Sequence, residues 1–362
     1  MSKYILIGAD PNSKHVDNPG GQATACEGLI SYLESNYHQV KIIDTTQSSF
    51  PVPSIFSRLR KGFMRSFTLI YTLMFTRYSG VILFSSAGFS FYERAVQCLI
   101  CKLFGVESIL CVRSGHFITD VQTSDKYRNR ILKFLSFPSY IGAQGTPWVE
   151  FYKNLGVDKK RLVLLRNWLP PEFPKATKPR SVSNNVISFL FVGWMVEKKG
   201  VRELLDAASK LSSLGYNFRL KFAGGGDLLE EVTQSISALK LCGKVEVLGW
   251  KCKVDIIEEL RKSDVFVLPS KAEGFPNAML EAMSLGLPCI VTDVGAVSDS
   301  LINDFNGFLL EDSNACHIYD AMLKYLENNN LVSKHSKNTL ELVIKNHTAH
   351  ENCKQLLSVF NI

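Results

Sequence analysis

Two glutamates eight residues apart, Glu273 and Glu281, enclose a segment whose residue types suit a phosphorylated ligand. An apolar strand pattern ends at Ser270, a loop carries Glu273, and a helix pattern follows. The turn into that helix consists of Gly274, Phe275, Pro276 and Asn277. Free amides at a helix start attract anions, so the segment suits a diphosphate. Glu281, one turn into the helix, can accept hydrogen bonds from a vicinal diol such as a ribose, and Glu273 lies nearer to whatever is attached beyond the phosphates.

A second set of residues supports this interpretation over the alternative of two solvated carboxylates. The strand pattern FLFVGW runs into a loop with Gly193, Lys199 and Gly200 before the next helix. A lysine in such a loop can reach a phosphate as a point charge. The glycine triplet 224–226 follows another strand and allows the backbone to approach a ligand closely. Taken alone, that triplet suits a tight turn equally well.

The N-terminal half carries weaker candidates. Gly20 and Gly21 stand directly before a helix pattern, where their amides could face an anion or a hydroxyl-rich ligand; the alternative is a plain turn. Arg113 and His116 follow a central strand pattern, and ligands of parallel sheets bind at the carboxyl ends of strands. We expect Arg113 to contact phosphate. His116 is either structural or in contact with the donor sugar or the acceptor.

Alternating strand and helix patterns must position these residues. Such alternation indicates an α/β fold with parallel sheets and helices on both faces. The expected strands are 4–9, 39–44, 80–86, 108–113, 186–194, 218–226, 244–250, 265–270 and 288–293. The expected helices are 23–35, 95–106, 200–215, 228–240, 256–262 and 277–286.

A proline-rich stretch, 165–185, separates two such patterns and marks the expected domain boundary. The prediction is two Rossmann-like, doubly wound domains, 1–170 and 186–345, that face a central cleft. Residues 346–362 are expected to form a C-terminal helix that packs back toward the N-terminal domain.

Composition limits the class of protein. The 362 residues are 46% hydrophobic and 21% charged, as in soluble globular proteins. Neither a signal peptide nor an apolar run of transmembrane length is evident, which predicts a cytoplasmic protein or one attached to the inner face of the cell membrane. The nine cysteines lack the spacing of a metal or disulfide framework, so free thiols are expected.

Charge is divided unevenly along the chain. Residues 1–180 carry 23 Lys and Arg against 12 Asp and Glu, whereas the remainder carries 18 against 22. The stretch 54–75 interleaves Arg58, Arg60, Lys61 and Arg65 with phenylalanines. Such a mixture suits an anionic membrane surface or a lipid-diphosphate acceptor. The alternative is a core helix with a solvated basic face; no nucleic-acid-binding motif is present, so nucleic acid is not an expected partner.

The C-terminal motifs carry a family resemblance. The E-x7-E segment from Glu273 to Glu281, the loop VGWMVEKKG and the run DVFVLPSKAEGFPNAMLEAM resemble family 4 of the retaining glycosyltransferases, of the bacterial polysaccharide-biosynthesis type, over 186–310. The resemblance implies the GT-B fold, with an acceptor-binding N-terminal domain and a donor-binding C-terminal domain. It assigns Glu281 to the ribose hydroxyls, Glu273 to the transferred sugar, the amides of 274–277 to sugar or phosphate, and Lys199 to the diphosphate.

One position departs from the family pattern. An arginine usually follows the loop glycine, Gly193, and pairs with the lysine on the diphosphate, but here that position is Trp194. Lys198 is the candidate for the missing charge; otherwise phosphate binding depends on Lys199 and the helix amides.

The resemblance implies transfer of a hexose from a UDP- or GDP-sugar to a saccharide or lipid-linked saccharide, with retention of the anomeric configuration. Glu273, Lys199 and His116 are the catalytic candidates, and neither a metal nor a cofactor beyond the nucleotide sugar is implied. Two alternatives remain: a nucleotide-sugar epimerase or hydrolase on the same fold, and a non-catalytic partner subunit of a transferase. A NAD-dependent dehydrogenase is disfavoured, because no strand leads into G-x-G-x-x-G with an acidic residue about twenty positions on.

Overall fold

The computed structural model describes residues 1–13, 20–46, 54–182 and 186–360, apart from the exposure of Gly20 and Gly21 and the side chain of Ile344. The chain divides into two compact units. Unit 1 comprises Met1–Phe173 and His347–Ile362, and unit 2 comprises Pro174–Asn346. The proline-rich stretch 165–185 contains the point at which the chain passes from one unit to the other.

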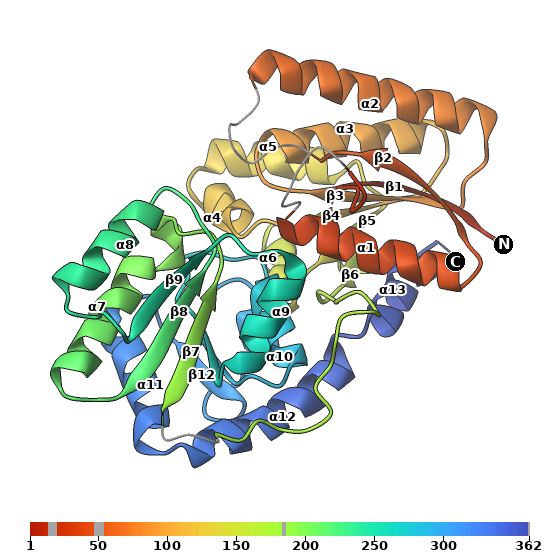
Figure 1. The fold of residues 1–362 in the computed structure, drawn as a ribbon. Helices are drawn as coiled ribbons and strands as arrows, with labels where there is room; N and C mark the ends of the chain where they lie inside the picture. The colour runs from red at the N-terminus through yellow and green to blue at the C-terminus, as the bar shows by residue number, and fades with distance from the viewer. Residues whose placement is uncertain (14–19, 47–53, 183–185, 361–362) are drawn as a thin grey trace. The chain divides into compact units, whose positions relative to one another are not determined.

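Unit 1 is built on a sheet of six parallel strands in the order β2-β1-β3-β4-β5-β6 (Figure 1). The strands are β1 (Lys3–Gly8), β2 (Gln39–Asp44), β3 (Gly80–Ser85), β4 (Ser108–Val112), β5 (Tyr140–Ala143) and β6 (Leu162–Leu164). Strands β3 and β4 are buried along their whole length, which explains their continuous apolar sequence: a parallel strand covered by helices on both faces has no solvent-facing side.

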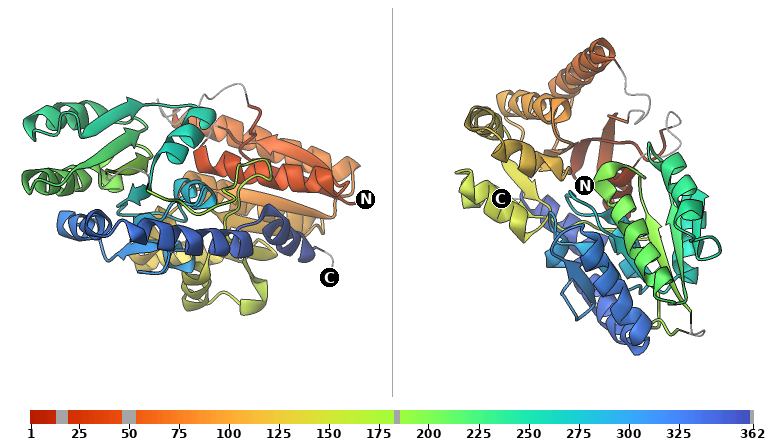
Figure 2. Two further views of the ribbon diagram at one scale, coloured as in Figure 1. Left: turned by 60° about the horizontal axis from the view of Figure 1, so that its bottom comes forward. Right: turned by 90° about the vertical axis from the view of Figure 1, so that its left-hand side faces the viewer.

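Helices cover both faces of this sheet (Figure 2). They are α1 (Gly20–Ser35), α2 (Ile55–Phe75), α3 (Phe89–Leu103), α4 (His116–Gln122), α5 (Asp125–Leu135), α6 (Thr146–Asn154) and α13 (Ala349–Ser358), with a 3-10 turn η1 (Lys159–Arg161). The predicted helix around Cys98 and Cys101 is α3, and both thiols are buried. It ends at Leu103, and Gly105 then takes a φ of +68°, which favours glycine.

Helix α13 completes the core of unit 1 from the far end of the chain. It packs against α1, and Cys353, Leu356 and Phe360 join Tyr4 and Leu29 in one buried cluster. The C-terminal segment is therefore part of the same hydrophobic core as the first strand.

Unit 2 repeats the architecture with a second six-stranded parallel sheet, in the order β12-β11-β10-β7-β8-β9. Its strands are β7 (Ile187–Val192), β8 (Phe218–Ala223), β9 (Val245–Gly249), β10 (Val265–Leu268), β11 (Cys289–Thr292) and β12 (Gly307–Leu310). Its helices are α7 (Val201–Ser213), α8 (Leu229–Ala238), α9 (Lys253–Lys262), α10 (Asn277–Ser284), α11 (Ala315–Glu327) and α12 (Asn330–Asn346), with 3-10 turns η2 (Glu197–Lys199) and η3 (Val297–Asp299). No described helix has both the length and the apolar content needed to cross a bilayer.

The elements around the E-x7-E segment lie close to their predicted ranges. The strand expected to reach Ser270 ends at Leu268, because Pro269 cannot donate a backbone hydrogen bond to the sheet. Helix α10 begins at Asn277, as the pattern 277–286 predicts, and Pro276 is the residue before it.

A buried charged cluster fastens α2 to α3 in unit 1. The guanidinium of Arg65 on α2 donates from Nε to Glu93 Oε1 at 2.7 Å and from Nη2 to Oε2 at 2.9 Å. Arg94 Nη1 lies 2.8 Å from the same Oε1. Burial raises the pKa of the Glu93 carboxyl, but the hydrogen bonds and charges of Arg65 and Arg94 outweigh it and lower the pKa below its usual 4.5.

We predict that Glu93→Gln destabilises unit 1 by about 3–5 kcal/mol at neutral pH, because it leaves two buried guanidinium groups without a charged partner. Since the folded-state pKa of Glu93 is lowered, its contribution is complete above pH 4.5 and is lost as the pH falls through the folded value. Thermal unfolding from pH 7 to pH 3 should therefore show a weaker acid dependence in the variant than in the wild type.

The matched control is Glu150→Gln, which removes the exposed pair between Glu150 and Lys153 on α6. Exposed pairs contribute little, so this variant should follow the wild type. Parallel pH profiles of Glu93→Gln and the wild type would contradict the predicted role of Glu93.

Candidate active site

An ion pair in unit 2 joins two of the residues singled out from sequence. Lys199, the last residue of η2, follows β7, and Glu273 lies in the loop after β10. The Lys199 Nζ donates to Glu273 Oε1, and the two side chains are only 16% and 13% exposed. Strands β7 and β10 are neighbours in the sheet, so both residues lie at its carboxyl edge. This is the edge at which parallel sheets bind ligands.

Two glycines hold the loop of Glu273 in place. Gly200 adopts a φ of +68°, and a Cβ there would lie 2.1 Å from the Pro269 carbonyl oxygen. Gly295, at a φ of +64°, passes equally close to the backbone of Glu273 and Gly274. The adjacent Ala296 amide donates to the Gly274 carbonyl at 2.9 Å. Only glycine fits these contacts, so the chain segments after β7, β10 and β11 meet at one place.

The remaining residues of the E-x7-E segment surround the start of α10. Gly274, Phe275 and Pro276 are buried, whereas Asn277 and Glu281 are half-buried. Pro276, the residue before the helix, makes no side-chain cap hydrogen bond. The structure thus places Glu273, the helix start and Glu281 in sequence along one strand–loop–helix unit.

The loop of Gly193 packs against the glycine triplet. The Gly193 amide donates to the Ala223 carbonyl at 3.0 Å, and a Cβ at Gly224 would lie 1.9 Å from the Gly193 carbonyl oxygen. The triplet therefore allows these two loops to approach each other closely. Trp194 projects beside it, 37% exposed, with its ring centre 4.6 Å from that of Trp250 in an edge-to-face arrangement.

Lys198, the candidate substitute for the absent arginine, is an exposed residue of η2. Its carbonyl accepts a hydrogen bond from the Lys271 amide at 2.8 Å, which ties η2 to the loop after β10. Lys271 adds another exposed cation, with its Nζ 2.7 Å from Glu197 and 2.9 Å from Glu203.

In unit 1, Gly20 and Gly21 are the first residues of α1, while Pro19 lies outside the described residues. His116 is half-buried and begins α4 directly after the β4 loop. Helix α1 thus begins three residues before the predicted 23–35 and includes both glycines, whereas the proposed ligand contacts of Gly20, Gly21 and His116 stay predictions.

Arg113 is drawn into the interior of unit 1. Its guanidinium carbon lies 4.7 Å from the Phe84 ring centre and 4.9 Å from the Trp168 ring centre, and its Nη1 donates to Asn167 at 3.0 Å. Burial lowers its pKa. Arg113 is thus enclosed by two aromatic rings and hydrogen-bonded to Asn167, and its contact with phosphate stays a prediction.

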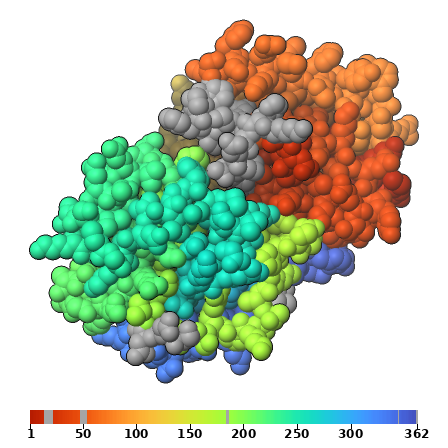
Figure 3. Space-filling view, viewed as in Figure 1, coloured from red at the N-terminus to blue at the C-terminus, as the bar shows by residue number. Residues whose placement is uncertain are grey.

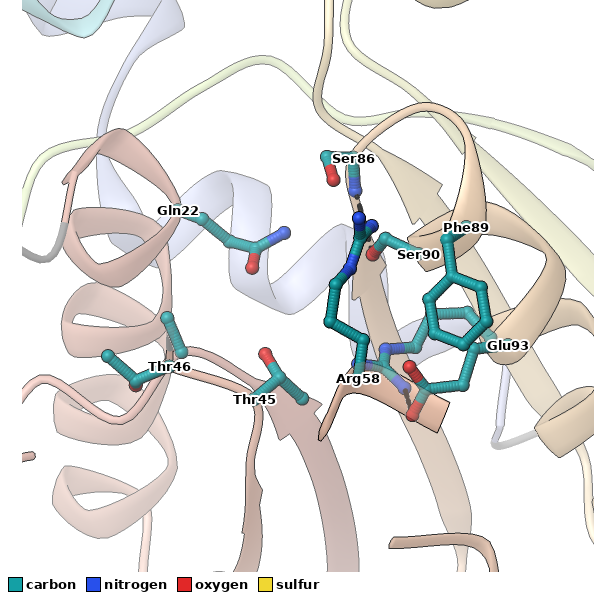
Figure 4. A pocket seen from close by; sticks show the side chains of 10 residues that line it. Gln22, Thr45, Thr46, Arg58, Ser86, Phe89, Ser90 and Glu93 are labelled. Carbon is teal, nitrogen blue, oxygen red and sulfur yellow. Dashed lines mark hydrogen bonds and ion pairs between the residues drawn. The ribbon is translucent and has the colours of Figure 1, made fainter. Parts of the chain in front are cut away.

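A cavity of about 260 Å³ opens at the carboxyl ends of β1, β2 and β3 in unit 1, and sequence reasoning did not identify it (Figure 4). Its lining is mostly polar and comprises Ala9, Gln22, Thr45, Thr46, Arg58, Ser86, Phe89, Ser90, Glu93 and Arg94. Figure 4 shows the Arg58 side chain reaching from α2 toward Ser86 and Ser90, with Gln22 on the opposite side. Its guanidinium carbon lies 5.2 Å from the Phe89 ring centre.

Among the described residues that line the cavity, Arg58 and Arg94 are basic and Glu93 is acidic. The Glu93 carboxylate already pairs with Arg65 and Arg94. Arg58 adds a further cation. Thr46 is held by Asp44, whose Oδ1 accepts from the Thr46 amide at 2.7 Å and from the Asp10 amide at 3.1 Å. The cavity therefore suits an anionic ligand with hydroxyl groups.

A signal for this cavity was present in the sequence but is weak. Thr45, Thr46 and Ser86 each follow a strand directly, which is where a parallel sheet binds ligands. Arg58 could not be assigned to the cavity, because only the packing of α2 decides which face of the helix turns inward.

Comparisons with known proteins bear on both units. Residues 174–342 match the family described as glycosyl transferases group 1. The chain is 30% identical over 201 residues to the UDP-Gal:alpha-D-GlcNAc-diphosphoundecaprenol alpha-1,3-galactosyltransferase of Escherichia coli, which covers 52% of this chain and 51% of that protein. It is 28% identical over 207 residues to a Campylobacter jejuni diphospho-undecaprenol alpha-1,3-N-acetylgalactosaminyltransferase, covering 57% and 45%. The chain thus matches about half the length of these curated relatives.

Solved structures resemble the chain over its full length. Sucrose-phosphate synthase of Thermosynechococcus elongatus superposes with a TM-score of 0.79 at 17% identity, covering 100% of this chain and 98% of that one. HepE of Anabaena, in complex with UDP and glucose, gives a TM-score of 0.75 at 15% identity with full coverage of both chains. At these identities the likeness establishes the fold, and it confirms the predicted GT-B class.

Proposed function

Because residues 174–342 match the family described as glycosyl transferases group 1, we propose that this chain transfers a hexose from a nucleoside-diphosphate sugar to a lipid-linked saccharide. The ion pair of Lys199 and Glu273 at the carboxyl edge of the second sheet is the observation that carries the proposal. The curated relatives named above act on undecaprenyl-diphosphate-linked saccharides, which supports a lipid-linked acceptor. The HepE structure holds UDP, so a UDP-sugar is the donor to test first, ahead of a GDP-sugar.

In this proposal the donor binds to unit 2. Its diphosphate lies beside Lys199 and the first amides of α10, and its ribose hydroxyls donate to Glu281. Lys199 has three N–H donors, so it can retain Glu273 while it binds a phosphate oxygen. Glu273 then faces the sugar on the far side of the diphosphate.

The exposed pair of Trp194 and Trp250 gives a reason for the departure from the family pattern. Aromatic faces bind bases and sugars by stacking, and this pair stands at the ends of β7 and β9. We assign it to the nucleoside part of the donor, whereas Lys198 supplies positive charge near the diphosphate.

Transfer breaks the bond between the anomeric carbon and the diphosphate and forms a bond from that carbon to an acceptor hydroxyl oxygen, whose proton passes to the departing diphosphate. Negative charge grows on the departing diphosphate, and Lys199 and the α10 amides lie where they can stabilise it. Retention of the anomeric configuration follows from the resemblance of the E-x7-E motif to the retaining family and belongs to the same proposal. His116 is assigned to the sugar or the acceptor.

We predict that Glu281→Ala raises the KM for the donor by about tenfold to a hundredfold, because it removes charge-assisted hydrogen bonds to the ribose. Glu273→Gln should mainly lower kcat, by roughly a hundredfold, since its contact with the sugar matters most during transfer. Steady-state kinetics with varied donor checks both effects. Glu258→Ala on α9, an exposed glutamate, is the control. Wild-type kinetics for Glu281→Ala and Glu273→Gln would contradict the site.

The acceptor is assigned to the cavity of unit 1, where the positive charge of Arg58 suits the diphosphate of a lipid-linked saccharide. We predict that Arg58→Gln raises the KM for a short-chain prenyl-diphosphate saccharide about tenfold or more, because a charge-assisted contact is lost. With a simple glycoside that lacks the diphosphate, the variant should match the wild type. Arg219→Gln, an exposed arginine on β8, is the matched control. An equal loss with both acceptors would contradict this assignment.

A further inference from the structure

Helix α2 carries an apolar stripe that no other described element covers. Its exposed large hydrophobic residues are Ile55, Phe56, Leu59, Phe63, Met64, Phe67, Tyr71, Met74 and Phe75, each between 51% and 78% exposed. Soluble monomers rarely leave a continuous apolar surface of this kind, and those that do use it for a partner or a membrane. Figures 1 and 2 show α2 as the outermost layer of its unit, and Figure 3 shows it at the surface.

The two faces of α2 lie in different surroundings. The inner face is fixed by Arg65, Leu69 and Thr72, which are buried against the unit, and by Arg58, which lines the cavity. The outer face therefore cannot turn inward to hide its aromatic residues. The stripe follows helical spacing through Phe56, Phe63, Phe67 and Met74 and so runs the length of the helix.

The charged residues around the stripe indicate which kind of partner binds it. Between Asp44 and Glu93 the sequence has no acidic residue, but it has five Lys and Arg. Arg60 and Lys61 are exposed near the start of the helix, and Arg77 is exposed just beyond its end. Cations at both ends of an apolar helix face are complementary to an anionic bilayer surface, whereas two copies of this face would repel each other.

A hollow of about 500 Å³ extends the apolar surface at the end of α2. Leu73, Phe75, Phe104 and Val106 line it together with Arg77. Leu103, beside it, is 77% exposed. The hollow gives lipid chains room next to the stripe.

We propose that α2 docks unit 1 onto an anionic membrane, lying in the plane of the headgroups with its apolar stripe among the acyl chains. The 21-residue helix is about 31 Å long, so it presents its whole stripe to the surface without crossing the bilayer. The docking goes beyond the proposed transfer reaction and does not depend on it. Since Arg58 lies on the same helix, docking would hold the charged cavity near the membrane surface.

The test is flotation of the full chain with two kinds of vesicle. One kind is phosphatidylcholine alone, and the other contains about 30% of the anionic lipid phosphatidylglycerol. The wild type should bind the anionic vesicles more strongly, and salt should weaken the binding. Arg60→Gln with Lys61→Gln should reduce the partition coefficient about thirtyfold, because each cation near an anionic surface contributes about fivefold. Phe63→Gln with Phe67→Gln should reduce it at least about tenfold for both vesicle types.

Matched controls lie in unit 2. Lys334→Gln with Lys337→Gln removes two exposed lysines of α12, and Leu214→Gln with Val254→Gln removes two exposed apolar residues; both should bind like the wild type. Unchanged thermal unfolding of all variants verifies their folds. Absence of wild-type binding would overturn the proposal, as would equal binding by the α2 variants. A wild-type dimer in light scattering that Phe63→Gln with Phe67→Gln dissociates, without vesicle binding, would assign the stripe to a second copy instead.

Discussion

The close approach of three chain segments at the carboxyl edge of the second sheet is the constraint on which the donor site depends. Gly200 and Gly295 allow the segments after β7 and β11 to pass within contact of the segment after β10. Lys199 and Glu273 are thereby held together in a half-buried pair. In the proposed function, this ammonium and carboxylate, together with the start of α10, contact the diphosphate and the sugar of one ligand.

Unit 1 depends on a second charged cluster, in which Glu93 joins α2 to α3. The pairing with Arg65 fixes the rotation of α2, and this rotation has two consequences. It directs Arg58 into a polar cavity, and it directs the aromatic stripe away from the unit. The basic and aromatic residues that are interleaved in the sequence are thus separated by the fold into a ligand-facing set and an outward-facing set.

Much of this fold could be predicted from the sequence, because continuous apolar strands and amphipathic helices have distinct periods. Most strands of both sheets and the two α/β domains were predicted in this way, whereas the GT-B class was implied by the family resemblance. The structure brings Lys199 and Glu273 together, whereas their roles at a diphosphate and a sugar stay predictions. The cavity around Arg58 could not be predicted, since a helix of 21 residues with apolar residues on all sides gives no indication of which face packs inward. The enclosure of Arg113 by Phe84 and Trp168 likewise depends on contacts distant in sequence.

Binding of a nucleoside diphosphate to unit 2 is the central claim, and thermal unfolding with UDP, GDP, ADP and their sugar conjugates tests it most directly. A ligand that binds only the folded state stabilises it by about 2.7 kcal/mol at a hundredfold excess over its Kd. The account predicts that UDP and a UDP-sugar, or else GDP and a GDP-sugar, raise the unfolding temperature, and that Lys199→Ala reduces this shift. An unchanged unfolding temperature with every nucleotide, or an equal shift in Lys199→Ala, would contradict it.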